Sequence, residues 1–421
     1  MSSRPLPLAL YAAATGLMAP FAPALLRARA AQGKEDPARL GERLGRTVQP
    51  RPPGPLAWLH GVSVGETQAL LPLIEALRAR RPGLNILVTC GTVTAAQVLA
   101  KRLPVGVLHQ FAPVDSPGAV ARFLDHWRPD LGVFVESELW PNLLLAARAR
   151  GVRLALLSAR ITEASARGWA RLPASARALM GAFDLVLPQD AATARRLQRL
   201  GATPGALLNL KRVGAPLPCD PAELKRLAKI AAGRRTVLAA STHPGEELMI
   251  ATAARDAGAG LVVVAPRHPD RGEAVAGDLA QAGFTVARRG AGQPLTAQAT
   301  AYVADTLGEM GLFLRLADVV VMGGSFVAGI GGHNPLEAAR LGKPMITGPH
   351  AHNARDSYDA LFAEVAALEA RDGPTLARHI AGLLANPAIA RRIGEAAQSF
   401  ADRQGAALDE ALVLLDPLLP A

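Results

Sequence analysis

Short apolar runs alternate along most of this chain with longer segments of helical periodicity. In the first half, six runs have the length and the β-type composition of strands, and helix-length segments separate nearly all of them. These runs lie at residues 57–64, 85–91, 106–112, 130–137, 153–160 and 184–188. Strands that alternate with helices predict a parallel sheet with right-handed crossovers and helices on both faces.

A second series of the same kind fills the other half of the chain. Its strands are expected at residues 236–241, 261–266, 284–287, 301–304, 319–322 and 344–347. Between the two series, the proline-rich segment 214–221 breaks both periodicities and predicts a linker. The predicted fold class is therefore α/β, with two tandem doubly wound parallel-sheet domains at 31–213 and 222–421, the latter helical from residue 373. Ligands of such sheets bind outside the carboxyl ends of the strands, so the expected site is a cleft between facing domains.

The amino-terminal segment has a different pattern, because residues 5–26 contain no charged side chain and Arg27, Arg29 and Lys34 follow them. Four prolines bound or interrupt the segment, so the uninterrupted helix is short for a full bilayer span. The cations after it place the following chain in the cytoplasm. We predict that residues 1–30 form a membrane anchor that lies on the bilayer or crosses it once. A helix packed on the protein is the alternative, while the charge polarity argues against a cleaved signal peptide.

Composition limits the remaining function classes. The chain has 421 residues, of which 50% are apolar, so each domain can bury its own core. The two cysteines, Cys90 and Cys219, form no C-x-x-C pair, which argues against a disulfide framework and a thiolate metal site and favours a reducing compartment.

The net charge of +11 is unevenly distributed along the chain. Residues 1–215 hold 27 Lys and Arg against 13 Asp and Glu, whereas residues 216–421 hold 19 against 22. The basic half is expected to meet an anionic partner. Aromatic residues are only 4% of the chain and no basic run is interleaved with them, which argues against nucleic acid. An anionic membrane or a phosphorylated lipid accounts for the asymmetry.

The strand at 319–322 runs into glycine-rich sequence, GGS at 323–325 and GGHNPLE at 331–337. Asn334, Pro335 and Glu337 are expected at the N-cap, first and third positions of a helix, and the glycines let backbone amides approach a ligand. This pattern predicts an anion or nucleotide site, with a well-capped helix after a loop as the alternative. A P-loop is excluded because Pro344 follows Lys343, and no G-x-G-x-x-G follows the first strand.

Glu66 follows the first predicted strand in the sequence HGVSVGE and stands where a helix begins. A carboxylate there could take a proton from a hydroxyl nucleophile. The alternative is a first-turn carboxylate stabilised by the helix dipole. At the end of the strand at 130–137, a period of two puts Glu136 and Glu138 on one side of the strand. They are expected either to pair with arginines such as Arg153 or Arg160, or to contact the acceptor or the transition state.

Two loops of the second domain, STHPGEE at 241–247 and PRHP at 266–269, each follow an apolar strand and precede a helix. Arg267 is suited to a phosphate because its guanidinium is always charged and binds two oxygens at once. His243 and His268 have no Asp/His cluster with ligand spacing beside them, so we expect them to donate hydrogen bonds rather than to bind metal.

Taken in order, these motifs resemble those of the bacterial Kdo transferases over essentially the whole chain. The resemblance extends to GKE at 33–35, ERLG at 42–45, SAR at 158–160, NLK at 209–211 and DTLGEM at 305–310. Each motif is weak alone, but their joint order is specific. That family adds 3-deoxy-D-manno-oct-2-ulosonic acid (Kdo) to the lipid A precursor. The resemblance implies a GT-B fold, with CMP-Kdo bound mainly by the C-terminal domain and the phosphorylated lipid acceptor by the N-terminal one, at the cytoplasmic face of the bacterial inner membrane.

The resemblance also implies roles for individual residues. Glu66 matches the family's proton acceptor, and Glu136 and Lys211 match its transition-state-stabilising residues. The family's CMP contacts map onto Pro266, Arg267, Gly308, Glu309, Met310, Asn334, Pro335, Leu336 and Glu337. The implied reaction is inverting transfer without a metal or other cofactor: Glu66 deprotonates the acceptor hydroxyl, and Arg267 and helix amides hold the departing phosphate. Glu337 would then contact ribose hydroxyls or the helix cap.

This chain departs from the family pattern in two places. Gly61 and Val62 replace small alanines before SVGE, and SARIT at 158–162 replaces the common N-A-R-L-S, which affects the expected acceptor geometry. A nucleotide-sugar epimerase or a glycosyltransferase with a uridine diphosphate donor is the rival enzyme prediction. A membrane-bound binding protein with an inactive transferase fold is the rival from another class, and the retained Glu66 and Arg267 argue against it.

Overall fold

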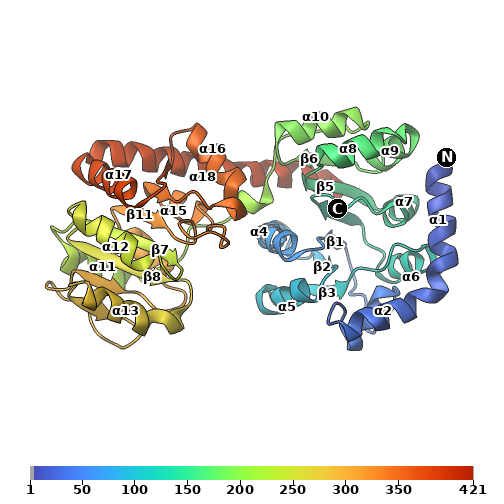
Figure 1. Ribbon diagram of the computed structural model, residues 1–421. Coiled ribbons are helices and arrows are strands. Elements are labelled where there is room, and N and C mark those ends of the chain that lie inside the picture. Colours follow the sequence, from blue (N-terminus) through green and yellow to red (C-terminus); the bar gives the residue numbers. More distant parts are fainter. Residues whose placement is uncertain (1–3, 421) are drawn as a thin grey trace. The chain divides into compact units, whose positions relative to one another are not determined.

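The computed structural model describes residues 4–420, and it divides into two compact units. The N-terminal unit takes the chain up to Val213 and again from Gln404, and the C-terminal unit takes Gly214–Arg403. Figure 1 shows the helices and strands of each unit, coloured along the sequence.

The N-terminal unit is built on a six-stranded sheet in the order β3-β2-β1-β4-β5-β6. All its neighbouring strands are parallel. The strands are β1 (Leu56–His60), β2 (Asn85–Cys90), β3 (Leu108–Phe111), β4 (Leu131–Val135), β5 (Arg153–Ala159) and β6 (Leu185–Pro188). The order reverses between β1 and β4, where His60 pairs with both Thr89 and Phe134. The carboxyl ends of β1, β2 and β4 therefore share one edge at the switch point of the sheet.

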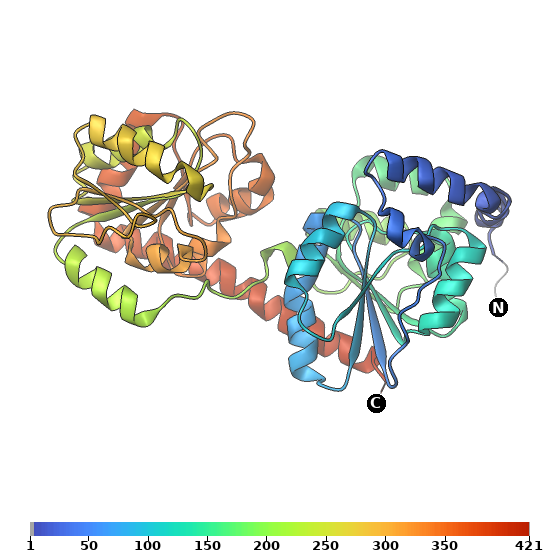
Figure 2. The same cartoon turned by 90° about the horizontal axis from the view of Figure 1, so that it is seen from below.

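Helices cover both faces of this sheet (Figure 2). They are α4 (Val64–Arg80), α5 (Val93–Arg102), α6 (Pro117–Trp127), α7 (Pro141–Ala149), α8 (Glu163–Ala170), α9 (Pro173–Met180) and α10 (Ala191–Arg199). Along β1 the side chains alternate between two cores. Trp58 packs with residues of α6, α7 and α9, and Leu59 packs with residues of α4 and α5. Side-chain caps start several helices, as where Thr92 accepts the N–H of Ala95 at 3.2 Å.

The C-terminal unit holds a seven-stranded sheet in the order β13-β12-β11-β7-β8-β10-β9, again parallel throughout. The strands are β7 (Thr236–Thr242), β8 (Leu261–Pro266), β9 (Val286–Arg288), β10 (Ala301–Val303), β11 (Val319–Met322), β12 (Met345–Thr347) and β13 (Leu368–Glu369). The helices are α11 (Pro221–Ala231), α12 (Glu247–Asp256), α13 (Gly272–Gln281), α14 (Met310–Leu316), α15 (Leu336–Ala339), α16 (Arg355–Ala363) and α17 (Gly373–Ala385). Two parallel-sheet α/β units in tandem confirm the predicted fold class.

The last helix, α18 (Pro387–Leu415), corrects the predicted domain boundary. The sequence predicts that 222–421 form one domain, but the chain from Gln404 belongs to the N-terminal unit. Its buried side chains, Leu408, Ala411, Leu412, Leu415 and Leu419, join the core under α4 and α5. Arg80 and Arg81 of that unit also pair with Asp416 at 3.1 and 3.3 Å. The helical periodicity runs through this boundary without a break, so the pattern of the sequence does not mark it.

The predicted linker 214–221 belongs to the C-terminal unit. Leu217 packs against the core of that unit, and Arg315 donates a hydrogen bond to its carbonyl at 2.6 Å. Pro221 is already the first residue of α11. The segment is therefore packed as part of the C-terminal unit, and it is not a linker outside both units.

The amino-terminal segment is helical, as α1 (Leu6–Met18), a 3-10 turn (Ala19–Phe21) and α2 (Ala22–Ala31). Within the described part of the chain, Leu6–Ala31 is the one helical stretch long and apolar enough to cross a membrane, by length and composition alone. It also packs against the N-terminal unit, where Tyr11 donates to Asp115 at 3.0 Å beside the buried Leu8. Residues 1–3 of the predicted anchor lie outside the described residues.

Two strands end two or more residues earlier than the sequence predicts. The strand expected at 57–64 ends at His60, because Ser63 caps α4 and Val64 is its first residue. The strand expected at 130–137 ends at Val135, because Glu136 has a left-handed backbone with φ of 58°. Strand β13 was not predicted, while the strands at 261–266 and 319–322 are confirmed to the residue.

Candidate active site

Three predicted site residues gather at the carboxyl edge of the N-terminal sheet. Glu136 directly follows β4, and its carboxylate forms an ion pair with the Lys211 ammonium. A Cβ built at Gly65 would lie 3.9 Å from Lys211 Nζ, so the first turn of α4, which carries Glu66, lies beside this pair. Glu136 is largely buried and Lys211 is partly exposed, so the ammonium is open to a ligand.

The prediction that Glu136 and Glu138 share one side of a strand is wrong, because β4 ends at Val135 and both glutamates lie in the loop after it. Glu138 Oε2 lies 3.7 Å from His60 Nε2 and accepts a hydrogen bond from Trp140 Nε1. The pairing expected with Arg153 does not form, since Arg153 binds Asp184 at 3.1 Å. A left-handed backbone at a residue other than glycine is strained, and it aims Glu136 at Lys211 rather than along the strand.

Lys211 is held in place by a bulge in β5 that sequence reasoning missed. The register between β5 and β6 shifts between Leu157 and Ala159, and Ser158 there has φ of 50°. Its hydroxyl oxygen accepts the backbone N–H of Leu210 at 3.3 Å. Asn209 Oδ1 accepts the N–H of Lys211 at 3.2 Å and closes the short 3-10 turn. The only sequence signal was the serine of the SAR motif.

Glu66 forms a capping box with Ser63 at the start of α4. Its Oε2 accepts the N–H of Val62 at 2.7 Å, and its Oε1 accepts the Ser63 hydroxyl at 2.6 Å. The Ser63 oxygen in turn faces the N–H of Glu66 at 3.4 Å. This geometry supports the alternative of a helix-start carboxylate. Each carboxylate oxygen still has a second acceptor position, so the cap leaves room for a substrate hydroxyl.

His60 is a buried polar residue at the end of β1. The sequence pattern includes it in the HGVSVGE motif but assigns it no role. Thr89 Oγ1 accepts the indole N–H of Trp58 at 2.8 Å and lies 2.8 Å from His60 Nδ1. The Thr89 hydroxyl can either donate its own proton to Nδ1 or accept a second N–H there, so it holds the His60 ring in either tautomer. The other ring nitrogen, Nε2, is buried and lies 3.7 Å from Glu138 Oε2, beyond hydrogen-bond distance.

In the C-terminal unit, the glycine-rich turn after β11 binds an internal carboxylate. Glu246 is fully buried. Its Oε2 accepts the amides of His243 at 2.9 Å and Gly324 at 2.6 Å, and its Oε1 accepts those of Ser325 at 3.0 Å and Phe326 at 2.8 Å. The prediction that the GGS amides approach a ligand is therefore wrong for Gly324 and Ser325, because Glu246 already occupies their donors.

The predicted helix cap at 334–337 is close to the observed one. Asn334 Oδ1 accepts the N–H of Leu336 at 3.1 Å, and α15 is a single turn of four residues. Burial raises the pKa of Glu337, and Arg340 and Arg267 oppose that rise. Pro335 and Leu336 are buried, whereas Asn334 is exposed. Among the predicted CMP contacts of this loop, Asn334 and Glu337 are the polar side chains.

Three loops of the C-terminal unit meet around a group of histidines. His243 Nε2 and His333 Nε2 are 3.0 Å apart, and the ring centroids of His243 and His268 are 5.8 Å apart. Burial, and then the neighbouring His243, Arg267 and His268, lower the pKa of His333 to about 4. Arg267 follows β8 and the buried Pro266, and its side chain is exposed without a hydrogen bond or ion pair to any residue between 4 and 420. The loops at 241–247, 266–269 and 331–337 thus share one edge of the sheet.

The predicted contacts at 308–310 belong to a separate ion-pair network. Arg289 binds the Glu309 carboxylate through two nitrogens and also pairs with Glu223 at 2.7 Å. The hydrogen bond from Arg289 is the main cause that lowers the pKa of Glu309. Gly308 has a left-handed backbone with φ of 83°, and Met310 begins α14. No hydrogen bond or ion pair between described residues links Glu309 to Arg267 or Glu337.

Residues 4–420 contain no group of three or more His, Cys, Asp and Glu side chains placed to hold a metal ion. The expectation of metal-independent chemistry stays a prediction.

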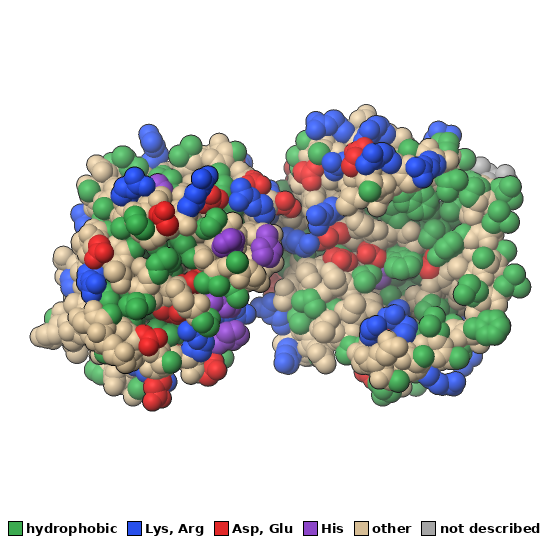
Figure 3. Space-filling view, in the orientation of Figure 1, with side chains coloured by type: hydrophobic (Ala, Val, Ile, Leu, Met, Phe, Trp, Pro, Cys, Tyr) green, Lys and Arg blue, Asp and Glu red, His purple; other side chains and the backbone are tan. Residues whose placement is uncertain are grey.

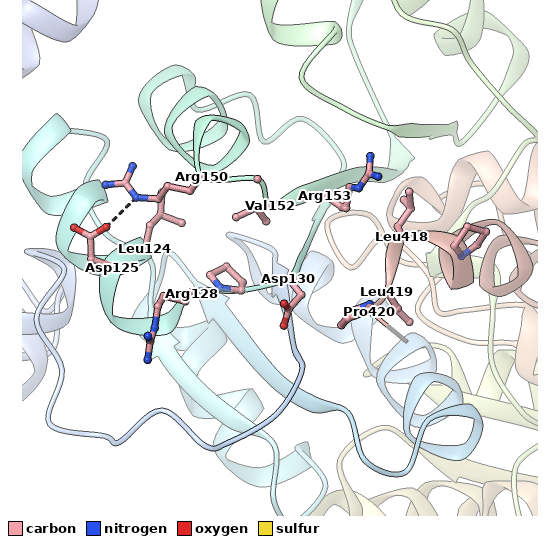
Figure 4. Close-up of a pocket in the computed structure, with 13 residues that line it drawn as sticks. Leu124, Asp125, Arg128, Asp130, Arg150, Val152, Arg153, Leu418, Leu419 and Pro420 are labelled. Atoms are coloured by element: carbon pink, nitrogen blue, oxygen red, sulfur yellow. Dashed lines mark hydrogen bonds and ion pairs between the residues drawn. The ribbon is translucent and has the colours of Figure 1, made fainter.

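A cavity of about 720 Å³ lies at the other edge of the N-terminal sheet (Figure 4). Its lining includes Asp130, which precedes β4, and Arg153, which begins β5, together with carboxyl-terminal residues such as Leu418. Glu136, which follows β4, and Ser158, near the end of β5, lie at the opposite edge, so the cavity is separate from the candidate active site.

Comparison with known proteins identifies the family. Residues 38–212 match the model for 3-deoxy-D-manno-octulosonic-acid transferase (kdotransferase). The chain is 37% identical over 415 residues to the 3-deoxy-D-manno-octulosonic acid transferase of Bordetella pertussis. That alignment covers 93% of this chain and 94% of the relative. The chain is also 38% identical over 357 residues to a probable mitochondrial 3-deoxy-D-manno-octulosonic acid transferase of Arabidopsis thaliana, over 81% and 79% of the two chains.

The fold comparison agrees with the two-unit architecture. The crystal structure of a glycosyltransferase from Rickettsia africae aligns with a TM-score of 0.56 at 11% identity, over 87% of this chain and 99% of that one. That likeness supports a GT-B glycosyltransferase fold, and the sequence relatives supply the family. The chain belongs to the 3-deoxy-D-manno-octulosonic acid transferase (Kdo transferase) family.

Proposed function

We propose that this protein transfers Kdo from CMP-Kdo to the lipid A precursor by an inverting, metal-independent reaction. The observation that carries the proposal is the Glu136–Lys211 ion pair beside the Glu66 turn, at the carboxyl edge of the sheet in a member of this family. Ligands of such sheets bind at this edge.

In this proposal Glu66 is the base. Its carboxylate is already oriented by Ser63 and Val62, so a substrate hydroxyl would meet a fixed acceptor rather than a mobile side chain. Lys211 would stabilise negative charge that develops in the transition state, and Glu136 would hold the ammonium in position. Because the Glu136 carboxylate is largely buried, the ion pair also keeps it from being an unpaired charge.

The donor would bind in the C-terminal unit, with its phosphate at Arg267. This guanidinium is exposed and makes no hydrogen bond or ion pair with a described residue, although it acts electrostatically on Glu337, so no ion pair must break before a phosphate binds. The neighbouring His243, His268 and His333 supply further hydrogen-bond donors. Glu337 would accept hydrogen bonds from ribose hydroxyls, a role that a carboxylate near a phosphate can fill without facing it.

The reaction is tested with CMP-Kdo, tetraacylated lipid A precursor and EDTA, with products resolved by thin-layer chromatography. We expect product from the wild type, about 10²–10⁴-fold slower turnover from Glu66→Gln, and no change from Glu75→Gln, an exposed glutamate on the same helix. The glutamine keeps an acceptor for the Val62 amide, so the fold is retained. Full activity of Glu66→Gln would overturn the base assignment, and no product from folded wild type would overturn the reaction.

We also propose that the α1–α2 segment lies in the membrane surface at the cytoplasmic face. Large apolar side chains line one stripe of it, namely Leu6, Leu10, Leu17, Met18, Phe21 and Leu25, all more than 60% exposed. Figure 3 shows hydrophobic side chains along the edge where Figure 1 places α1. The opposite stripe docks on the protein through polar contacts, in which Asn142 binds Arg4 at 2.7 Å and Thr15 at 3.0 Å. A spanning helix would have to break these contacts, whereas an in-plane helix keeps them.

This placement is tested by vesicle sedimentation with anionic lipids. Burying one large apolar side chain in the membrane contributes about 1.5–3 kcal/mol. The Leu17→Asp/Phe21→Asp variant loses two such contributions, so it should bind the vesicles at least about tenfold more weakly. Val105→Asp changes an exposed apolar residue outside the α1–α2 segment, so this variant should bind the vesicles as wild type does. Protease protection of the amino terminus in sealed vesicles that display the catalytic units outside would contradict the in-plane arrangement.

A further inference from the structure

His243 and His333 form a contact that fixes how many protons the two rings can hold. Their Nε2 atoms are 3.0 Å apart and the rings are nearly parallel, with an interplanar angle of 12°. Two nitrogens at this distance share one proton, as N–H···N. When both rings are neutral, the donor ring carries its proton on Nε2, and the acceptor ring carries its proton on Nδ1. One Nδ1 therefore remains bare, and the pair can take up one proton without losing its shared hydrogen bond.

The surroundings keep this pair neutral in the free protein. Burial lowers the pKa of His243; the neighbouring His268, Arg267 and Arg271 add to that effect, while Glu246 opposes it. Glu246 is a weak counter-ion here, because its carboxylate is already bound by four backbone amides. Arg271 is itself paired with Glu247 at 2.5 Å. Glu337 is the remaining carboxylate near Arg267, and its burial disfavours the ionised form, so cations outnumber anions around the pair.

We propose that the His243–His333 pair takes up one proton when the phosphate of a nucleoside monophosphate binds beside Arg267, and so forms a charge-matched phosphate site. This inference rests on the proposed function, because it takes the CMP phosphate as the ligand of these loops. A phosphomonoester dianion adds two negative charges beside the pair, and it favours the protonated form of the pair.

The proton has a place in the transfer reaction. When the bond between the anomeric carbon and the phosphate oxygen breaks, its electron pair stays on that oxygen. The acceptor hydroxyl oxygen forms the new bond, and its proton goes to Glu66. The phosphodiester of CMP-Kdo carries one negative charge and the departing CMP carries two. A protonated histidine pair balances the additional charge on the leaving group.

The sign of the pH dependence follows from linkage. The pKa of the pair is lowered in the free protein and raised when the dianion is bound. Between these two values binding consumes a proton, so the affinity for CMP falls as the pH rises, by up to about tenfold per pH unit. Above pH 7 CMP is mostly dianionic, so its own titration contributes little there.

The test is calorimetric titration of CMP into the full-length protein at pH 7.5, in two buffers with different ionisation enthalpies. For wild type we expect uptake of between about 0.3 and 1 proton per CMP bound. The double variant His243→Asn/His333→Asn should bind CMP with uptake near zero, because asparagine donates a hydrogen bond but does not titrate, whereas either single variant keeps one histidine that can take up a proton. His379→Asn, on α17 and outside the three loops, is the matched control and should match wild type. Cytidine, which lacks the phosphate, should bind without proton uptake.

Each outcome decides one question. Binding of CMP by wild type without proton uptake would overturn the proton-uptake proposal and leave the proposed function intact. Equal uptake in wild type and the double asparagine variant would also overturn it, because the proton would then be taken up by a group outside the pair. No CMP binding to folded wild type would instead overturn the proposed donor site. Thermal unfolding of each variant controls for loss of the fold.

Discussion

Glu246 provides a sharp test of how the C-terminal unit is held together. Its two carboxylate oxygens each accept two backbone amides, one oxygen from His243 and Gly324 and the other from Ser325 and Phe326. In Glu246→Gln an amide NH₂ replaces one oxygen, so two of the four backbone N–H groups lose their acceptor. An unmet buried donor costs about 1–3 kcal/mol, so the substitution should destabilise the unit by about 2–6 kcal/mol. That is a large part of the 5–15 kcal/mol that stabilises a typical domain.

The assay must report on the C-terminal unit alone. All four tryptophans, at positions 58, 127, 140 and 169, belong to the N-terminal unit, so tryptophan fluorescence does not detect unfolding of the other unit. Hydrogen exchange measured by mass spectrometry in increasing urea resolves peptides from β7, β11 and the turn after β11. In Glu246→Gln these peptides should exchange at lower urea than in wild type, while peptides of β1 and β4 should be unchanged.

Glu273→Gln is the matched control for this substitution. Glu273 is an exposed glutamate of the same unit whose contact with Arg288 is 3.4 Å long, and its loss should change stability by less than about 1 kcal/mol. If Glu246→Gln opened the C-terminal unit no more easily than Glu273→Gln, the amide-bound carboxylate would not be a stabilising element. The assignment of the glycine-rich turn as an internal anion site would then be wrong.

Three further predictions concern the two candidate sites. Lys211→Met should lower kcat about 10²–10³-fold, and Glu136→Gln should lower kcat less. Steady-state kinetics would measure both effects, and urea unfolding would control for loss of the fold. Ser158→Ala should lower kcat about tenfold by freeing the Leu210 turn, and Ser158→Gly should do the same yet be the more stable of the two, because glycine adopts a positive φ without strain. The raised pKa of Glu337 means that its ionised form is disfavoured in the folded unit, a cost that grows as pH rises above the ordinary value of 4.5. Glu337→Gln should therefore unfold at slightly higher urea than wild type at pH 7 but bind CMP more weakly, as hydrogen exchange and calorimetry would measure.

The sequence predicts the parallel sheets well because buried parallel strands are near-continuous apolar runs, and the alternation with helices sets the topology. The same reasoning places Glu136, Arg267 and His243 after strands and hence at carboxyl edges. It fails where a turn has no glycine to mark it. Glu136 and Ser158 both have positive φ, so a period of two extrapolated through Glu136 put Glu138 on the wrong surface.

Long-range partners were the second kind of feature that the sequence could not supply. Glu246 and Gly324 are 78 residues apart, and nothing local to either motif predicts that the Glu246 carboxylate accepts the Gly324 amide. The GGS turn was therefore interpreted as a ligand site when it is an internal one. The bulge at Ser158 is likewise a property of the pairing between β5 and β6, and not of the residues around the serine. Such features depend on strand register, which a single sequence leaves open.

The internal use of the glycine-rich amides changes how a donor phosphate can be held in this unit. Backbone N–H groups offer a fixed partial charge that does not depend on pH. Because the amides of Gly324, Ser325 and Phe326 are bound by Glu246, the charge available at these loops comes from side chains. Arg267 is permanently charged, whereas the His243–His333 pair can gain or lose a proton. A site of this composition has a strong attraction for the dianionic product when the histidine pair is charged, and a weaker one when it is neutral. Release of the nucleotide would then be favoured by loss of a proton, so the same pair that stabilises the leaving group also sets how readily it departs.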